Sequence, residues 1–185
     1  MNLPNKLSML RICMIPFFVF FALMTPLWAQ LVALVLFCLA SLTDMLDGKI
    51  ARSRGLVTNF GKFIDPIADK LLVMSAFVVL VQQGRMPGWI CILMLAREFA
   101  ISGFRLVAAD AGVVIAAGML GKIKTCTQMA AIILLLLLTS AGDTAPMLGQ
   151  AGVVFANIVM YAAAFMTVWS GVDYIAKNFG LIKDM

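Results

Sequence analysis

Four aspartates, arranged as two closely spaced pairs, are the residues whose types and positions most strongly suggest a catalytic or metal-binding site. Asp44 and Asp47 lie three residues apart and Asp65 and Asp69 lie four apart, so each pair falls on one face of a helix. A charge near the bilayer centre costs about 2.5–3.5 kcal/mol, and carboxylates in apolar segments therefore usually mark a functional site. Each aspartate taken alone is also explained as a solvated ion pair with a nearby lysine or arginine. The four together favour a shared site.

Repulsion among four neighbouring carboxylates predicts a bound cation. Hard oxygen ligands favour Mg²⁺ or Mn²⁺. Zinc is disfavoured because the chain has no histidine and its four cysteines do not cluster. We therefore expect two divalent ions, Mg²⁺ or Mn²⁺, at this site.

The composition identifies the elements that must position these carboxylates. The chain has 185 residues, of which 63% are hydrophobic and 12% are charged, whereas soluble domains are about half apolar and a quarter charged. This excludes a soluble globular protein, a disordered chain and a disulfide-stapled secreted module. With about 20 apolar residues per span, the length allows six or seven spans. We expect an all-α polytopic membrane protein in which residues 1–185 form a single domain.

Breaks in the apolar sequence predict six transmembrane helices. Thr25-Pro26, the turn at 82–88, a Gly-containing connection and the segment 141–146 separate them. The first two expected helices cover roughly 8–25 and 28–52. The third begins near residue 60 and ends at the turn at 82–88, and the fourth continues from that turn to about 108. The last two cover roughly 121–140 and 148–174. The two aspartate pairs then lie near the end of the second helix and the start of the third, at similar depth. An even number of spans places both termini on one side.

The basic residues predict the orientation. Thirteen of the 14 lysines and arginines fall on the side of the termini or in the adjoining half-spans, and Arg85 falls opposite. Both termini are therefore expected in the cytoplasm, with a polar active-site cavity that faces it. The net charge of +5 then reflects loops at anionic headgroups, not nucleic-acid binding. A cleaved signal peptide within the first 30 or so residues is the less favoured alternative, because the apolar sequence resumes at once.

The aspartates also carry a resemblance. The run from Asp44 to Arg52, followed by Gly61, Asp65 and Asp69, matches the eight fixed positions of the CDP-alcohol phosphotransferase signature. The segment from Asn2 to Arg11 resembles the opening of that family, with Ser8 where threonine is common. Over its whole length the chain is similar to the bacterial, glycerophosphate-specific branch.

This resemblance implies a multi-pass homodimer in the bacterial inner membrane with a two-metal site. The implied enzyme is a phosphotransferase that moves the phosphatidyl group from CDP-diacylglycerol to sn-glycerol 3-phosphate and releases CMP, in the biosynthesis of phosphatidylglycerol and cardiolipin. Membrane lipid and the two substrates are the implied partners. Serine or inositol phosphate as the acceptor remains an alternative within the family.

The resemblance also implies roles for individual residues. Asp44, Asp47 and Asp65 become metal ligands, and Asp69 becomes the general base and a ligand of the second ion. The implied CDP-binding residues are Asn5, Gly48, Ala51, Arg52 and Gly61. Small residues one turn beyond Asp47 would also let a ligand approach the helix backbone, although helix packing explains them equally well.

A second polar group is basic and predicts an anionic acceptor. Glu98, Ser102 and Arg105 follow a helical i, i+4, i+7 stripe. The residues expected to bind the acceptor phosphate are Arg97, Arg105, Lys122, Lys124 and Thr125. We expect Glu98 to orient an arginine, although a structural Arg97–Glu98 pair and lysines that merely anchor the cytoplasmic side are alternatives.

An ion or proton transporter is the main hypothesis outside this family. Paired acidic and basic groups in a membrane can form such a pathway. A pathway needs polar groups in both halves of the membrane, however, and the outer half of this chain has almost none. The runs 132–138 and 153–168 are interpreted as lipid-facing or packing surface.

Overall fold

A computed structural model describes residues 3–54, 59–110, 113, 118–137 and 149–178. Within these ranges, side chains are described except at 3–7, 44–54, 59–66 and 69. The predicted link at 141–146 lies outside the described residues.

The described part of the chain forms six helices and no strand. The helices are α1 (Leu3–Leu23), α2 (Leu27–Arg54), α3 (Asn59–Gln82), α4 (Gly88–Asp110), α5 (Met119–Leu137) and α6 (Gly149–Lys177). The predicted breaks at Thr25-Pro26 and 82–88 are confirmed. The first helix begins five residues earlier than expected, because apolar content marks the part of a helix in hydrocarbon and not its ends. Pro4 is tolerated there, since the first turn needs no amide donor at that position.

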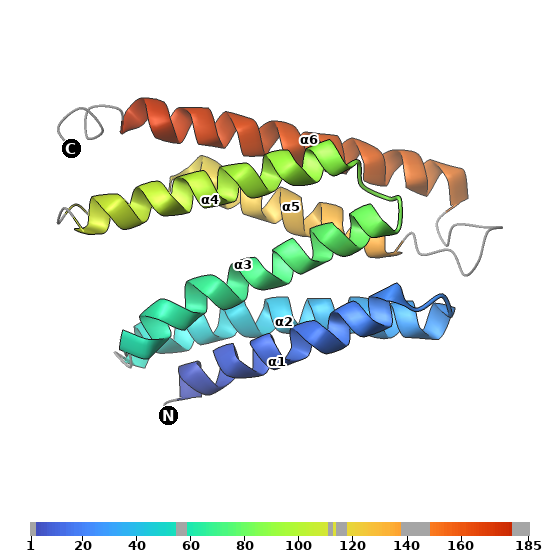
Figure 1. Ribbon diagram of the computed structural model, residues 1–185, viewed down its shortest axis with the longest axis horizontal. Coiled ribbons are helices and arrows are strands. Elements are labelled where there is room, and N and C mark those ends of the chain that lie inside the picture. Colours follow the sequence, from blue (N-terminus) through green and yellow to red (C-terminus); the bar gives the residue numbers. More distant parts are fainter. Residues whose placement is uncertain (1–2, 55–58, 111–112, 114–117, 138–148, 179–185) are drawn as a thin grey trace.

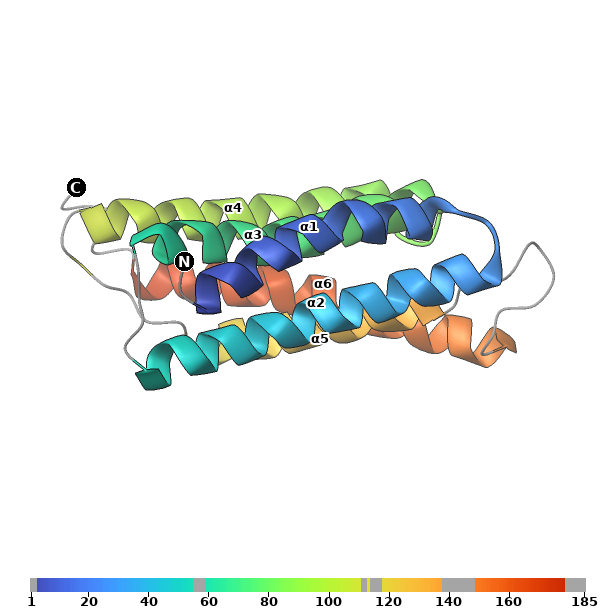
Figure 2. The same cartoon turned by 90° about the horizontal axis from the view of Figure 1, so that it is seen from below.

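The helices alternate in direction, so α1 begins and α6 ends at the same end of the bundle (Figures 1 and 2). The most extensive packing joins α1 to α2, α5 to α6 and α1 to α3. Fully buried aromatic and aliphatic side chains fill the interior, and Phe18 packs on Phe37 with ring centroids 5.7 Å apart. We call the end that holds the start of α1 the terminal end, and the other the far end.

Two helices, α5 and α6, are long and apolar enough to cross a membrane among the residues described. Large apolar side chains on α6 also point outward, and Phe155, Ile158, Phe165 and Trp169 are all more than half exposed. An exposed apolar surface of this kind is typical of a membrane or protein interface. These features are those of a membrane protein.

The turn between α3 and α4 lies at the far end (Figure 1). Gly84 adopts a left-handed φ of 69° there, which costs glycine little. Gln83 Nε2 donates to the Ala22 carbonyl at 2.6 Å and Arg85 Nη1 donates to the Leu135 carbonyl at 3.3 Å. This turn is therefore fixed to α1 and α5 by side-chain hydrogen bonds.

Candidate functional site

The predicted carboxylate site occupies the terminal end of the bundle. Asp44 and Asp47 lie in the last third or so of α2, and Asp65 and Asp69 lie in the first half of α3. Because α2 ends and α3 begins at the terminal end (Figures 1 and 2), the backbones of both pairs lie in the same part of the molecule. Their side chains are outside those described, so their predicted role as metal ligands stays a prediction.

The residues predicted to bind the CDP moiety belong to the same end. Asn5 lies in the first turn of α1, Gly48, Ala51 and Arg52 lie near the end of α2, and Gly61 lies at the start of α3. Their side-chain environment is likewise outside the described part. The start of α1, the end of α2 and the start of α3 thus all belong to the terminal end.

A cavity of about 290 Å³ lies beside this region, between α3, α4, α5 and α6. Its polar lining residues are Lys70, Arg97, Glu98, Ser102, Arg105, Lys124, Thr125, Ser170, Asp173 and Tyr174. The structure thus brings four of the five predicted phosphate-binding residues together, namely Arg97, Arg105, Lys124 and Thr125. Four cationic side chains and two carboxylates in this lining give it a formal charge of +2.

The helical stripe on α4 explains why this cavity is polar. Glu98, Ser102 and Arg105 recur at helical spacing, and all three line it. Lys122, by contrast, is exposed and is not among the lining residues. It lies two positions before Lys124, which places the two side chains about 200° apart around the helix. A direct phosphate contact by Lys122 is therefore not supported by this arrangement.

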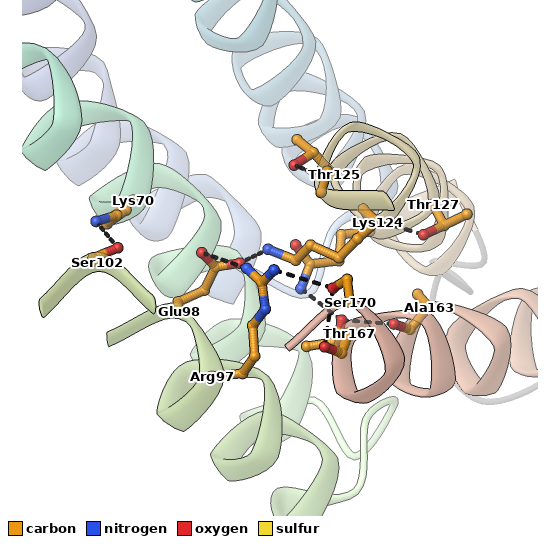
Figure 3. Close-up of polar contacts among 12 residues, drawn as sticks. Lys70, Arg97, Glu98, Ser102, Lys124, Thr125, Thr127, Ala163, Thr167 and Ser170 are labelled. Carbon is orange, nitrogen blue, oxygen red and sulfur yellow. Dashed lines mark hydrogen bonds and ion pairs between the residues drawn. The ribbon is translucent and has the colours of Figure 1, made fainter. Parts of the chain in front are cut away.

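Glu98 holds two cations at the cavity wall (Figure 3). Its carboxylate pairs with Lys124, and Glu98 Oε2 lies 3.8 Å from Arg97 Nη1. The Lys124 and Glu98 side chains are only 4% and 18% exposed. The expected Glu98–arginine contact is thus the longer of the two, and the closer partner of Glu98 is the lysine on α5.

A chain of hydrogen bonds extends this cluster onto α6 (Figure 3). Arg97 Nη2 donates to Ser170 Oγ at 3.0 Å, and Ser170 Oγ donates to the Thr167 carbonyl at 3.1 Å. Gln128 Nε2 on α5 donates to Thr167 Oγ1 at 3.3 Å. Helices α4, α5 and α6 are therefore joined by polar contacts where the cavity forms.

The sequence analysis missed the contribution of α6. Ser170, Asp173 and Tyr174 line the cavity, yet the helix was interpreted as apolar surface up to 168. Thr167, Ser170 and Tyr174 follow i, i+3, i+7 spacing on an otherwise apolar span, which is a signal for one polar face. The Tyr174 ring packs edge-on against Phe104 with centroids 5.9 Å apart, and its hydroxyl oxygen is buried without a protein partner among the described residues.

Lys70 on α3 was also missed as a cavity residue. The sequence suggested no binding role for it, but it lines the cavity and donates to Ser102 Oγ on α4 (Figure 3). Lys70 directly follows Asp69. Helix α3 therefore contributes consecutive residues to the predicted carboxylate site and to the basic cavity.

A second hollow of about 260 Å³ adjoins the cavity at the terminal end. Both are lined by Gly118, Leu120, Asp173 and Tyr174, and the outer hollow also contacts Lys177 and Asn178. Lys177 Nζ donates to Asp173 Oδ2 at 2.8 Å. The shared lining indicates a route from the end of the bundle to the basic cavity.

Comparison with known proteins identifies relatives over nearly the whole chain. The family model for CDP-alcohol phosphatidyltransferase matches residues 1–169. A Bacillus subtilis protein named CDP-diacylglycerol–glycerol-3-phosphate 3-phosphatidyltransferase is 43% identical, covering 98% of this chain and 97% of its own. A Rickettsia bellii protein of the same name is 42% identical over 94% of this chain and 93% of its own. A Mycobacterium tuberculosis protein named probable phosphatidylglycerophosphate synthase is 41% identical over 95% of this chain and 81% of its own.

Proposed function

This chain belongs to the CDP-alcohol phosphatidyltransferase family, and we propose that it transfers the phosphatidyl group of CDP-diacylglycerol to sn-glycerol 3-phosphate. The products are phosphatidylglycerophosphate and CMP. The names of its full-length relatives support this reaction. The observation on this chain that carries the proposal is the basic cavity beside the two helices that hold the aspartates, because its charge suits the phosphate of such an acceptor.

In the proposed membrane arrangement, all six helices span the bacterial inner membrane as one domain. Both termini and the cavity then face the cytoplasm. The alternation of the helices and the position of Arg85 at the far end support this orientation. It also places the cavity where a water-soluble phosphorylated acceptor is available. Two chains form a homodimer within the lipid in this proposal.

The donor half of the proposed site consists of α1, α2 and the start of α3. Asp44, Asp47, Asp65 and Asp69 would hold two Mg²⁺ or Mn²⁺ ions, since their donor set is entirely carboxylate oxygen. Bound there, the ions would supply neutralisation of the phosphate oxygens of the donor and of the departing CMP. The CDP moiety would be held by Asn5, Gly48, Ala51, Arg52 and Gly61, with the guanidinium of Arg52 on a phosphate oxygen.

The acceptor half is the basic cavity. In this proposal Arg97, Arg105 and Lys124 bind the phosphate of glycerol 3-phosphate. The Thr125 hydroxyl, which donates to the Gly121 carbonyl at 3.0 Å in this structure, would turn its proton to the phosphate instead. Lys122 contributes only to the local positive potential from its exposed position.

The chemical step then needs a proton acceptor between the two halves. Asp69 takes the proton from the attacking hydroxyl of glycerol 3-phosphate. The hydroxyl oxygen forms a bond to the phosphorus that carries diacylglycerol, and the bond from that phosphorus to CMP breaks. The position of Asp69 next to the cavity residue Lys70 supports this role. No histidine is present in the chain to compete for it.

An acceptor panel tests the reaction. The purified protein in detergent is given CDP-diacylglycerol and Mg²⁺ with glycerol 3-phosphate, serine, inositol phosphate or glycerol, and CMP release is measured. We expect glycerol 3-phosphate to exceed serine and glycerol by more than tenfold, because only a phosphorylated acceptor fills the basic cavity. We also expect it to exceed inositol phosphate, in line with the names of the full-length relatives. Excess chelator and Asp44→Asn should each nearly abolish turnover. A preference for serine or inositol phosphate would contradict the assignment of the acceptor.

A further inference from the structure

Gly171 on α6 lies against the side chain of Arg97 on α4. A Cβ atom at position 171 would lie 3.1 Å from Arg97 Cγ and 3.7 Å from Arg97 Nε. For the other glycines described in this way, including Gly103, a Cβ would meet nothing within 4 Å. Gly171 is also buried in the interior of a long helix, where glycine is among the least favourable residues. Its lack of a side chain therefore provides the space that Arg97 occupies.

The neighbouring residue holds the other end of the same arginine. Ser170 Oγ accepts from Arg97 Nη2 at 3.0 Å and is itself fixed by its bond to the Thr167 carbonyl. Consecutive residues of α6 thus lie against the stem and the head of Arg97, and Figure 3 shows the contact of the head with Ser170. Arg97 Nε is buried and has no protein partner among the described residues. This nitrogen lies on the side of the guanidinium that faces Gly171, and the Nη2 end is held by Ser170.

We propose that Ser170 and Gly171 are positioning residues that seat Arg97 for the phosphate of the acceptor. This inference rests on the proposed function. The guanidinium is a rigid planar fork, and its hydrogen bonds to phosphate depend on its orientation. A methyl group at position 171 crowds the stem at Cγ, 3.1 Å away, so the stem must shift by a few tenths of an ångström and the guanidinium moves with it. It therefore weakens acceptor binding, while the donor half on α1, α2 and α3 is left intact.

Two variants and a matched control test this. Gly171→Ala adds a methyl group against Arg97, Ser170→Ala removes the oxygen that orients the guanidinium, and Gly103→Ala makes the same glycine change on α4 where space is open. We expect Gly171→Ala and Ser170→Ala each to raise the KM for glycerol 3-phosphate by about five- to tenfold, as expected for a weakened charge-assisted hydrogen bond. The KM for CDP-diacylglycerol should change by less than about twofold in both, and Gly103→Ala should behave like the unmodified protein.

A double-mutant cycle separates positioning from a general effect on folding. In an Arg97→Ala background, Gly171→Ala and Ser170→Ala should cause no further rise in the KM for glycerol 3-phosphate, because they act through the arginine. Glycerol 3-phosphate should raise the melting temperature of Gly171→Ala and of Ser170→Ala by less than that of the unmodified protein, in parallel with their higher KM. This second readout does not depend on turnover.

Several results would overturn the proposal. These are an effect of Gly171→Ala equal to that of Gly103→Ala, equal increases in the KM for both substrates, or full additivity with Arg97→Ala. If Gly171→Ala does not fold, Ser170→Ala decides alone, since it adds no atoms. An unmodified protein that releases no CMP with glycerol 3-phosphate contradicts the proposed function instead, which distinguishes the two failures.

Discussion

Asp69 is the residue on which the proposed proton transfer depends. Asparagine preserves the shape of the side chain but cannot accept a proton, so Asp69→Asn should lower kcat by about 10²-fold or more. The KM for CDP-diacylglycerol should stay nearly constant, measured by CMP release at saturating Mg²⁺. Asp110→Asn, a change to an exposed carboxylate at the end of α4, is the matched control. A variant rescued fully by more metal would instead make Asp69 a metal ligand only.

Lys124 and Arg105 test the electrostatic basis of acceptor binding. A charge-assisted hydrogen bond contributes about 1.5–3 kcal/mol, so either Lys124→Ala or Arg105→Ala should raise the KM for glycerol 3-phosphate by about 10- to 100-fold. Lys122→Ala removes an exposed lysine of α5 that does not line the cavity and should have a much smaller effect. An unchanged KM for Lys124→Ala would reduce these cations to anchors of the cytoplasmic side. Steady-state kinetics with each substrate varied separately makes the comparison.

At the scale of helices, α6 is the element whose role changed most between sequence and structure. The stripe on α4 was predictable because its residues share one helix and a local spacing. The approach of Ser170 and Tyr174 to Arg97 was not predictable, because it depends on how two helices about 70 residues apart in sequence pack. The turn at 82–88 was predicted by its glycine and proline, whereas the helix ends were displaced because hydrophobicity marks only the segment in hydrocarbon.

Tyr174 provides a test of this α6 wall. Tyr174→Phe keeps the edge-on contact with Phe104 but removes the buried hydroxyl. A neutral hydrogen bond contributes about 0.5–1.5 kcal/mol, so we expect a two- to tenfold rise in the KM for glycerol 3-phosphate and little change in melting temperature. Phe104→Leu is the companion variant, since it loosens the ring but leaves the hydroxyl. A Tyr174→Phe variant with unaltered kinetics would restrict α6 to a structural role.

For the whole molecule, the alternation of six helices makes a topological prediction. In a chain whose four cysteines are replaced by alanine, Gln82→Cys places a thiol at the far end and Lys177→Cys places one at the terminal end, both at exposed positions. A membrane-impermeant maleimide should label Gln82→Cys in intact bacterial spheroplasts, and Lys177→Cys only after permeabilisation. The reverse pattern would invert the proposed orientation, and equal labelling of both in intact spheroplasts would argue against it.

The adjacency of Asp69 and Lys70 on α3 has a consequence for the evolution of substrate specificity. The residues proposed to bind the donor all precede Lys70, and the remainder of the acceptor cavity comes from α4, α5 and α6. In the proposed function, the donor-binding and acceptor-binding residues are therefore successive segments of the chain, which meet at the proposed base Asp69. If that assignment holds, we expect mutations in the part of the gene after Lys70 to change which alcohol is used without altering activation of the nucleotide-linked lipid, so new acceptors could evolve at constant chemistry.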